Sequence, residues 1–415
     1  MLAWTWSDSK RSSVKTQTKV EHLLVTTPQG TSGDLIKEAR FAFNYSAQQT
    51  EKEVSLTMPL RAESYASGAL LPIFEMNRPE GYLLSKIEEV FAKEGGLDDM
   101  RLLDIVGGAQ IGRLRYAWPE EKRPRLRGQI GLQEILARQP TSELFDFLVA
   151  TYFESGISGV QPKVLVPDDD KRNGALGRET VIHSDLIVKS GGDEFPHLTQ
   201  NEFMCLTAAR RAGIETPNFW LSEGGGLFVV ERFDLRDGQP LGFEDMTVLM
   251  NKGSRRKYEG SYENVAKALR LFLAGGDPLA ALRQLFEYIA FIVMVRNGDG
   301  HLKNFGVLYE HPSNPDSIRL APLYDVVTTS IYGFTNPGTF ITKYDRTLAL
   351  NLRKSRSYPD REALLAFGRE HCGVPRPEAV IERIADALSV TLTEQRERIP
   401  STLWQQLNEE WHVGL

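Results

Sequence analysis

The alternation of apolar and polar residues predicts strands in the first part of the chain. Residues 40–45 (RFAFNY) and 54–60 (VSLTMPL) alternate with period two, as strands with one buried face do. Short apolar segments at 164–166, 186–189 and 226–233 predict further strands. We therefore expect a β-rich beginning.

From about residue 234 onward, apolar residues at helical spacing predict a largely helical part. Glycine marks the end of two earlier helices, because Gly95 and Gly96 follow the first one and Gly213 follows another. The predicted helices are 83–93, 130–152, 201–212, 361–370, 377–392 and 403–412.

Polar and proline-containing stretches divide the chain into segments. Residues 1–18 lack an apolar period and are expected to form a loose arm, and residues 119–124 read as a linker. We therefore place a β-rich unit at 19–120, a second unit at 121–233 and a mainly helical unit at 234–415. A length of 415 residues agrees with two or three packed units.

The composition limits the cellular compartments and the binding partners that we expect for this protein. Apolar residues make up 41% and charged residues 25% of the chain, which is ordinary for a soluble globular protein. The 49 basic and 55 acidic residues give a net charge of −6, which argues against a surface devoted mainly to nucleic acid. Cys205 and Cys372 stand in unrelated surroundings and suggest no disulfide framework or cysteine zinc site. No apolar run is long enough to span a membrane, so we expect a cytoplasmic protein.

Residues 295–308 (VRNGDGHLKNFGVL) carry the clearest chemical signal. A Gly-Asp-Gly turn holds Asp299, Asn304 follows on the same loop, and Asp325 stands farther along the chain. Two carboxylates and an amide on loops between buried segments are what magnesium-assisted phosphoryl transfer needs. A structural alternative remains, in which Asp299 lies in a simple turn and Asp325 caps a helix.

Six short segments occur in the order of the parts of a protein kinase, although the usual G-x-G-x-x-G, H-R-D and D-F-G signatures are missing. Through these segments the chain resembles the HipA family of bacterial serine/threonine kinases, the toxins of HipBA-type modules. The segments are 158–163 (SGVQPK), 187–189 (IVK), 201–202 (NE), 230–234 (VERFD), 299–304 (DGHLKN) and 323–325 (LYD).

The N-terminal unit extends the resemblance through 56–61 (LTMPLR) and 74–81 (FEMNRPEG). The resemblance implies an α+β, two-lobed protein-kinase-like fold with an added N-terminal β-rich subdomain. The unit at 121–233 would then be the kinase-like N-lobe, and the unit at 234–415 the mostly helical C-terminal lobe.

The resemblance also implies roles around ATP and Mg²⁺. Asp299 would be the catalytic base that orients the acceptor hydroxyl, Asn304 and Asp325 would hold the metal, and Lys189 would contact the phosphates. The residues that would bind the nucleotide are Ser158, Gly159, Val160, Gln161, Lys163, Lys189, Glu231, Phe233, His301, Lys303, Asn304 and Tyr324.

Several of these residues also have plainer interpretations. Lys189 fits a strand-end lysine that reaches solvent, and Glu231 with Arg232 fits an exposed polar pair. Glu202 is a candidate partner for the phosphate-binding lysine, but it equally fits a solvent-facing helix residue.

The loop at 155–163 is where regulation is expected. Its glycines allow the backbone to approach phosphate oxygens closely. In the family, a serine of this loop is autophosphorylated, after which the loop is expelled and the nucleotide site is blocked. The usual serine position is Gly156 in this chain, so the expected phosphosite is Ser158, with Ser155 as the other hydroxyl. A turn serine bonded to its own backbone is the plain alternative.

Two further stretches stay open. Residues 326–346 mix Thr, Ser, Gly and Pro, which fits a kinase activation and substrate-binding segment or an ordinary connector. Residues 255–257 (RRK) form a basic cluster that fits a solvated patch, with phosphate or RNA contact as the other reading.

Family members inhibit translation by phosphorylating aminoacyl-tRNA synthetases, and they bind a helix-turn-helix antitoxin together with operator DNA. The resemblance implies such a protein substrate and such partners here. One rival is a non-catalytic antitoxin- or DNA-binding co-repressor subunit on a kinase scaffold, which the intact Asp299, Asn304 and Asp325 oppose. Another is a small-molecule phosphotransferase of the aminoglycoside type, which the 158–161 block and the N-terminal unit oppose.

Overall fold

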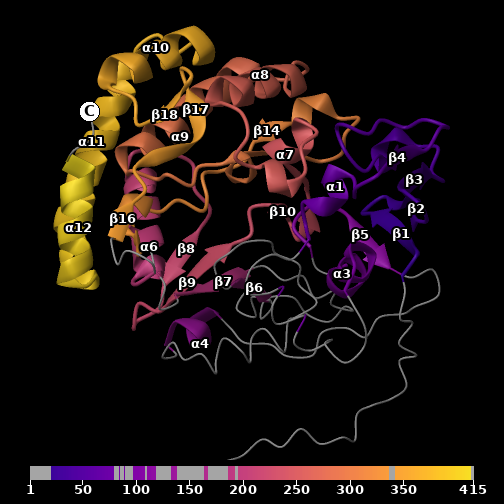
Figure 1. Cartoon of the computed structure of the whole chain (residues 1–415), viewed down its shortest axis with the longest axis horizontal. Helices are drawn as coiled ribbons and strands as arrows, with labels where there is room; N and C mark the ends of the chain where they lie inside the picture. The colour runs from indigo at the N-terminus through magenta and orange to yellow at the C-terminus, as the bar shows by residue number, and fades with distance from the viewer. Residues whose placement is uncertain are drawn as a thin grey trace, which may run out of the picture.

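Strands dominate the first part of the chain and helices the last, as the apolar pattern predicts (Figure 1). The computed structural model describes residues 20–78, 84, 88, 97–107, 110–117, 132–137, 163–166, 186–191, 195–335 and 342–412. The β-rich N-terminal unit and the C-terminal helices lie at opposite sides of the molecule in Figure 1.

The N-terminal unit is a five-stranded antiparallel sheet with strand order β4-β3-β2-β1-β5. Alternate residues of its strands are buried, and Leu23, Val25 and Phe43 fill its core. Two helices pack with this sheet, α1 (Pro72–Glu75) and α3 (Asp99–Val106). The strands are β1 (His22–Thr27), β2 (Gly30–Lys37), β3 (Phe41–Tyr45), β4 (Tyr65–Ser67) and β5 (Arg115–Ala117).

The strand expected at 54–60 was a wrong prediction, because this segment is a turn. Val54 and Met58 are both buried, so their spacing reflects a turn that directs two apolar side chains into one core. The Val54 N–H donates to the Tyr45 hydroxyl at 3.0 Å, and the Leu56 N–H donates to Glu244 at 2.8 Å. These backbone groups therefore bond to side chains rather than to a neighbouring strand.

The second sheet has the order β6-β7-β9-β8 and is antiparallel throughout. Helix α6 (Leu198–Arg211) packs against its strands β8 and β9, and the following Gly213 is left-handed, with φ of 72°. A short helix, α4, is described at Leu132–Ala137. The strands are β6 (Lys163–Val166), β7 (Leu186–Ser190), β8 (Phe219–Leu221) and β9 (Leu227–Glu231).

Helix α9 (Pro278–Met294) is the centre of the C-terminal part, and it packs against α8, α10 and α11. Its residues Leu282, Phe286 and Ile289 are fully buried, so the apolar run at 285–295 belongs to a protein core. None of the helices in the described ranges has the length and apolar content needed to cross a membrane. The other helices here are α7 (Met246–Leu249), α8 (Tyr262–Phe272), α10 (Arg361–Cys372), α11 (Pro377–Glu394) and α12 (Ser401–His412).

The part after residue 234 also contains short strands. The strand at the end of 295–308 was expected and appears as β13, whereas the others were not predicted because each pairs over only a few residues. Two of them fall within 326–346, so that stretch is not irregular throughout. The strands are β10 (Leu235–Arg236), β11 (Gln239–Pro240), β12 (Gly242–Asp245), β13 (Gly306–Tyr309), β14 (Arg319–Leu320), β15 (Gly333–Thr335), β16 (Thr342–Tyr344), β17 (Thr347–Leu352) and β18 (Ser355–Ser357).

Two hydrophobic cores hold these elements together. The larger one surrounds α9 and reaches from α6 to α12. The smaller one belongs to the N-terminal sheet, but it also includes Phe243, Val248 and Leu308, with Phe233 and Tyr324 packed against it. The N-terminal unit thus packs against residues that precede and follow the Asp299 loop in the sequence.

Candidate functional site

The centre of the site is the ammonium group of Lys189 on β7. Its Nζ donates to Glu202 Oε1 at 2.5 Å and to Asp325 Oδ1 at 2.7 Å. The Lys189 side chain is only 6% exposed and that of Glu202 1%, whereas that of Asp325 is 36% exposed. Burial by itself would lower the pKa of Lys189, but Asp325 and Glu202 outweigh burial and raise it. Lys189 is therefore a buried cation with one enclosed and one open partner.

Helix α6 contacts both Lys189 and the segment that follows Asp325. It carries Glu202, and its neighbour Asn201 donates from Nδ2 to the Thr328 carbonyl at 3.0 Å. The Thr328 N–H in turn donates to Asn201 Oδ1 at 2.9 Å. Since Asn201 is fully buried, this reciprocal pair holds the segment that follows Asp325 against α6.

The backbone of Asp325 is unusual for a residue other than glycine. Its φ is +57°, in the left-handed region, which costs such residues on the order of 1–2 kcal/mol. Conformations of this kind cluster at sites where a side chain must point in a set direction. Asp325 precedes no helical turn directly, so the expected structural alternative of a helix cap does not describe it.

The loop of Asp299 and the segment of Asp325 lie side by side. The Gly298 N–H donates to Thr329 Oγ1 at 2.6 Å, and the Thr329 N–H donates to the Arg296 carbonyl at 3.2 Å. The Tyr324 hydroxyl donates to the Lys303 carbonyl at 2.7 Å. The geometry thus brings the two loops together along their length.

The Gly-Asp-Gly turn owes its glycines to space rather than to positive φ. Neither Gly298 nor Gly300 has a positive φ, and the left-handed residue nearby is Arg296, before the turn, with φ of 56°. A Cβ added to Gly298 would lie 2.5 Å from the Thr347 carbonyl oxygen, which real Cβ atoms do not tolerate. Asp299 does lie in a turn, as the structural alternative expects, but the turn needs Gly298 for lack of space.

Asn304 and His301 shape the end of this loop, and both are buried. Asn304 Oδ1 accepts the His301 N–H at 3.0 Å. Burial lowers the pKa of His301 to about 3, and the charges of Lys257 and Lys303 act in the same direction. Asp325 acts on His301 in the opposite direction, which again places that carboxylate near the loop.

Phe233 and Tyr324 form the aromatic side of the site. Their rings stack with centroids 5.1 Å apart and an interplanar angle of 29°. The Phe243 ring meets both rings edge to face, with its centroid 5.7 Å from that of Phe233 and 6.2 Å from that of Tyr324. Two of the residues expected to bind the nucleotide are thus in contact. Glu231, on β9 just before this group, accepts from Asn218 Nδ2 at 2.7 Å.

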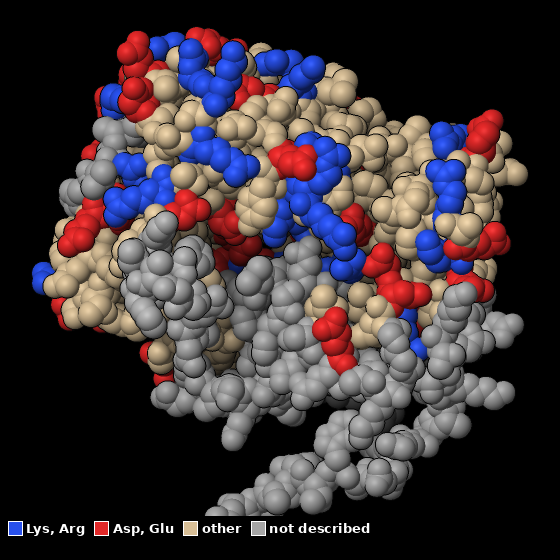
Figure 2. Space-filling view, in the orientation of Figure 1, with Lys and Arg blue, Asp and Glu red and all other residues tan. Residues whose placement is uncertain are grey.

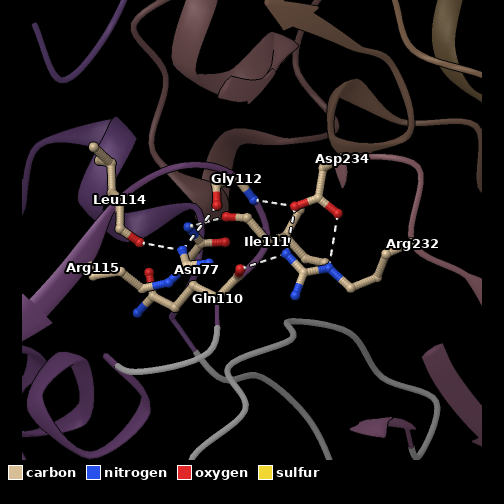
Figure 3. A network of polar contacts seen from close by, with 8 residues as sticks. All are labelled: Asn77, Gln110, Ile111, Gly112, Leu114, Arg115, Arg232 and Asp234. Carbon is tan, nitrogen blue, oxygen red and sulfur yellow. Dashed lines mark hydrogen bonds and ion pairs between the residues drawn. The ribbon is translucent and has the colours of Figure 1, made fainter. Parts of the chain in front are cut away.

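A buried ion pair joins the segment around Phe233 to the N-terminal unit (Figure 3). Arg232 donates from Nε to Asp234 Oδ1 at 2.9 Å and from Nη2 to Asp234 Oδ2 at 2.6 Å. Arg232 Nη2 also donates to the Gln110 carbonyl at 2.8 Å, and Asp234 Oδ2 accepts the Gly112 N–H at 2.6 Å. Arg232 is buried, so the interpretation of Glu231 and Arg232 as an exposed polar pair was wrong for Arg232.

A second buried contact across the same interface is made by Glu244 on β12. Its carboxylate accepts from Ser55 Oγ at 2.9 Å, from the Leu56 N–H at 2.8 Å and from the Tyr309 hydroxyl at 2.5 Å. Tyr309 ends β13, the strand that follows the Asp299 loop. The N-terminal unit is therefore tied to both flanks of the candidate site.

The basic cluster at 255–257 lies in the loop after α7. Figure 2 shows Lys and Arg side chains gathered near the middle of the face, where α7 lies in Figure 1. Glu259 pairs with Arg256 at 2.7 Å and with Lys252 at 3.6 Å, so part of this charge is neutralised. The cluster is mainly a solvated patch in this structure.

Part of the predicted site lies outside the described residues. This holds for Ser155, Ser158, Gly159, Val160 and Gln161. Lys163 begins β6, directly opposite Lys189 in the β6–β7 register. That register brings the end of the predicted phosphate loop to the strand lysine.

The oxygen-bearing side chains of the site fit a Mg²⁺ ion that is also bound by the phosphates of a nucleotide. Asp325 offers an accessible carboxylate and Asn304 an amide, both oxygen-bearing groups that suit a hard cation. No group of three or more His, Cys, Asp or Glu side chains poised for a metal occurs among the described residues. Magnesium commonly takes one or two protein ligands and completes its shell with water and phosphate oxygens. The donor set is therefore suitable for a metal that arrives with a nucleotide.

Sequence reasoning missed three features of the site. Glu202 was named as a candidate but left out of the site, although it contacts Lys189. Asn201 had no assigned role, and Tyr258, whose hydroxyl donates to Asp299 Oδ1 at 2.8 Å, was not noticed. Tyr258 is distant from Asp299 in sequence and follows a charged loop, so no local pattern marks it.

Comparison with known proteins agrees with this geometry. The chain matches the family model of the HipA-like C-terminal domain over residues 155–393 and that of the HipA N-terminal domain over residues 23–117. A putative kinase of Haemophilus influenzae is 30% identical over 192 residues, which cover 42% of this chain and 53% of that protein. The serine/threonine-protein kinase toxin HipA of Shewanella oneidensis is 26% identical over 196 residues, or 42% of this chain and 43% of that protein.

The aligned region thus spans about half the length of these curated relatives. The structure of the Shewanella oneidensis HipA, solved with HipB and its operator DNA, superposes with a TM-score of 0.67 at 19% identity. That superposition covers 94% of this chain and 95% of the other, and it confirms the expected α+β fold. Because the C-terminal family model alone matches more than half of the sequence, the chain belongs to the HipA family.

Proposed function

We propose that the chain is an ATP-dependent serine/threonine protein kinase of the HipA type. The observation that carries this proposal is the buried Lys189 ammonium, bonded to Glu202 at 2.5 Å and to Asp325 at 2.7 Å. Kinases need a lysine held by a helix glutamate beside a metal-binding aspartate. The names of the relatives from Haemophilus influenzae and Shewanella oneidensis support the same chemistry.

In this proposal Lys189 contacts the phosphates of ATP, and Glu202 keeps the ammonium in place. Asp325, whose carboxylate is accessible, would hold the metal together with Asn304. When bound, Mg²⁺ and ATP supply charge neutralisation and the γ-phosphoryl group. The stacked pair of Phe233 and Tyr324 lies beside the base.

Asp299 acts on the acceptor. Asp299 is exposed, and its carboxylate would accept a hydrogen bond from the acceptor hydroxyl and orient the hydroxyl oxygen toward the γ-phosphate. The backbone of Asp299 is held by Asn297, whose Oδ1 accepts the Asp299 N–H at 2.9 Å. Most of the rate enhancement then comes from positioning and electrostatics, because phosphoryl transfer asks for little covalent chemistry from the protein.

The variant Asp299→Gln tests the proposal. Wild type and variant are incubated with radiolabelled ATP and a bacterial lysate, and the labelled band is identified by mass spectrometry. We expect the variant to lose transfer by on the order of 10²–10⁴-fold with an unchanged melting temperature, because its side chain only loses the base. Undiminished labelling by Asp299→Gln, or no labelling by wild type, would contradict the assignment.

The relatives also support finer proposals. The Shewanella oneidensis HipA was solved with HipB and operator DNA, so we propose a comparable antitoxin partner for this chain. The acceptor would be a protein, by resemblance an aminoacyl-tRNA synthetase. Ser158, or else Ser155, stays the predicted autophosphorylation site, and peptide mapping of the same ATP reaction would locate the phosphate.

A further inference from the structure

Tyr258 lies in the loop after α7, and 40% of its surface is exposed. Surface tyrosines at loop ends usually point their hydroxyl to water. Here the hydroxyl donates to Asp299 Oδ1 at 2.8 Å, in a contact that joins residues far apart in the sequence. Hydrogen bonds to an ionised carboxylate are roughly twice as strong as neutral ones.

Three further contacts hold Tyr258 in this orientation. Its ring meets the His301 ring edge to face, with centroids 5.1 Å apart and an interplanar angle of 75°. Its carbonyl accepts from Arg356 Nη2, on strand β18, at 2.5 Å. The carbonyl of its neighbour Lys257 accepts the Leu302 N–H at 3.0 Å, which ties the tyrosine loop to the Asp299 loop. The hydroxyl is therefore aimed rather than free to rotate through solvent.

A carboxylate base must present one oxygen to the acceptor hydroxyl in a fixed direction, because a misplacement of about 1 Å can cost on the order of 10²-fold in rate. The Asn297 contact fixes only the backbone of Asp299. The Tyr258 hydroxyl, in contrast, bonds to the carboxylate itself and so constrains its orientation. A carboxylate has about four lone-pair positions, so this bond does not prevent it from accepting the acceptor hydroxyl.

We propose that Tyr258 is a positioning residue for phosphoryl transfer, whose hydroxyl holds the Asp299 carboxylate in the orientation that receives the acceptor hydroxyl. This inference rests on the proposed kinase function. It adds a residue from the loop after α7 to a site otherwise formed by β7, α6 and the two loops around Asp299 and Asp325.

The variant Tyr258→Phe separates this role from a structural one, because it keeps the ring against His301 and removes only the hydroxyl. Transfer from radiolabelled ATP to the lysate protein labelled by wild type is measured at saturating and at low ATP. We expect kcat to fall about tenfold, as for a lost hydrogen bond to a charged group, while KM for ATP and the melting temperature stay unchanged.

The matched control is Tyr65→Phe. The Tyr65 hydroxyl also donates a hydrogen bond, to the Pro59 carbonyl at 2.6 Å, but Tyr65 lies in the N-terminal unit. We expect this control to leave kcat unchanged. An unchanged kcat in Tyr258→Phe, an increase, or an equal loss in Tyr65→Phe would overturn the inference. If wild type transfers no phosphate, the proposed function itself fails and the role of Tyr258 fails with it.

Discussion

Two aspartates in this molecule each accept hydrogen bonds from a buried cation, but their surroundings differ. Asp234 faces Arg232 with both side chains 1% exposed. Asp325 faces Lys189 with 36% of its side chain exposed, and Lys189 keeps a second carboxylate in Glu202. The first pair is closed on all sides, whereas the second opens toward solvent through its aspartate.

The difference separates a contact that builds the molecule from one that can change partners. Removing one member of an enclosed pair leaves a charge without compensation, which is strongly unfavourable. Asp325 can leave Lys189 without stranding it, because Glu202 stays at 2.5 Å. Asp325 has a positive φ, a backbone conformation that Asp adopts more readily than most residues. Its accessible carboxylate and the second partner of Lys189 mark Asp325 as the residue that can bind a ligand.

The largest effect on stability is expected for Asp234→Asn. The new amide cannot accept from both Arg232 and the Gly112 N–H without bringing two donors together, and Arg232 would be left charged and buried. We expect the free energy of unfolding to fall by about 3–5 kcal/mol in urea denaturation. The double variant Arg232→Met/Asp234→Leu should recover part of this loss, since it buries no unpaired charge. A double variant less stable than Asp234→Asn would contradict this account.

A smaller effect is expected for Glu244, the second buried acid of the closed interface. Burial raises the pKa of Glu244 to about 7 from an ordinary value of 4.5, although the bonds from Tyr309, Leu56 and Ser55 oppose this. The folded chain therefore holds the proton more tightly than the unfolded chain. This contribution to stability is fully present below about pH 4.5 and is lost as the pH rises through 7, by about 3 kcal/mol.

Urea denaturation between pH 5 and 8 tests this sign. The unfolding free energy of wild type should fall relative to that of Glu244→Gln as the pH rises, because glutamine does not titrate. Parallel pH curves for the two proteins would show that Glu244 has no raised pKa in the folded chain.

The smallest effect on stability is expected for Asp325→Asn. Its carboxylate is partly solvated, Lys189 retains Glu202, and asparagine tolerates the left-handed backbone better than most residues. We expect the unfolding free energy to change by less than about 1 kcal/mol. A loss as large as that of Asp234→Asn in the same urea titration would mean that Asp325 is a structural partner of Lys189.

Local patterns predicted the elements whose stability is mainly local. The helices expected at 361–370, 377–392 and 403–412 appear as α10, α11 and α12 with small shifts at their ends. The strands at 40–45 and 186–189 appear as β3 and β7 for the same reason. The helix at 83–93 is described only at residues 84 and 88, both helical, and the one at 130–152 only as α4. The division at 18, 120 and 233 stays a prediction.

Errors arose where a distant residue decided the outcome. The segment 54–60 alternates like a strand, but Glu244 takes its backbone donor from the other side of the interface. The alternative of an exposed Arg232 was wrong because its acceptor, the Gln110 carbonyl, lies far away in the sequence. Tyr258 reaches Asp299 only through the tertiary fold. The roles assigned to the site residues themselves stay predictions that rest on resemblance and on this geometry.

The most direct test of the account is the affinity of Mg²⁺–ATP for Asp325→Asn and Asp234→Asn, measured by isothermal titration calorimetry below the melting temperature of both. The two variants make the same chemical change beside a buried cation. We expect Asp325→Asn to bind at least about tenfold more weakly than wild type, since it loses a metal ligand, and Asp234→Asn to bind as wild type does. Wild-type affinity in Asp325→Asn would contradict the assignment of this cluster as the nucleotide site.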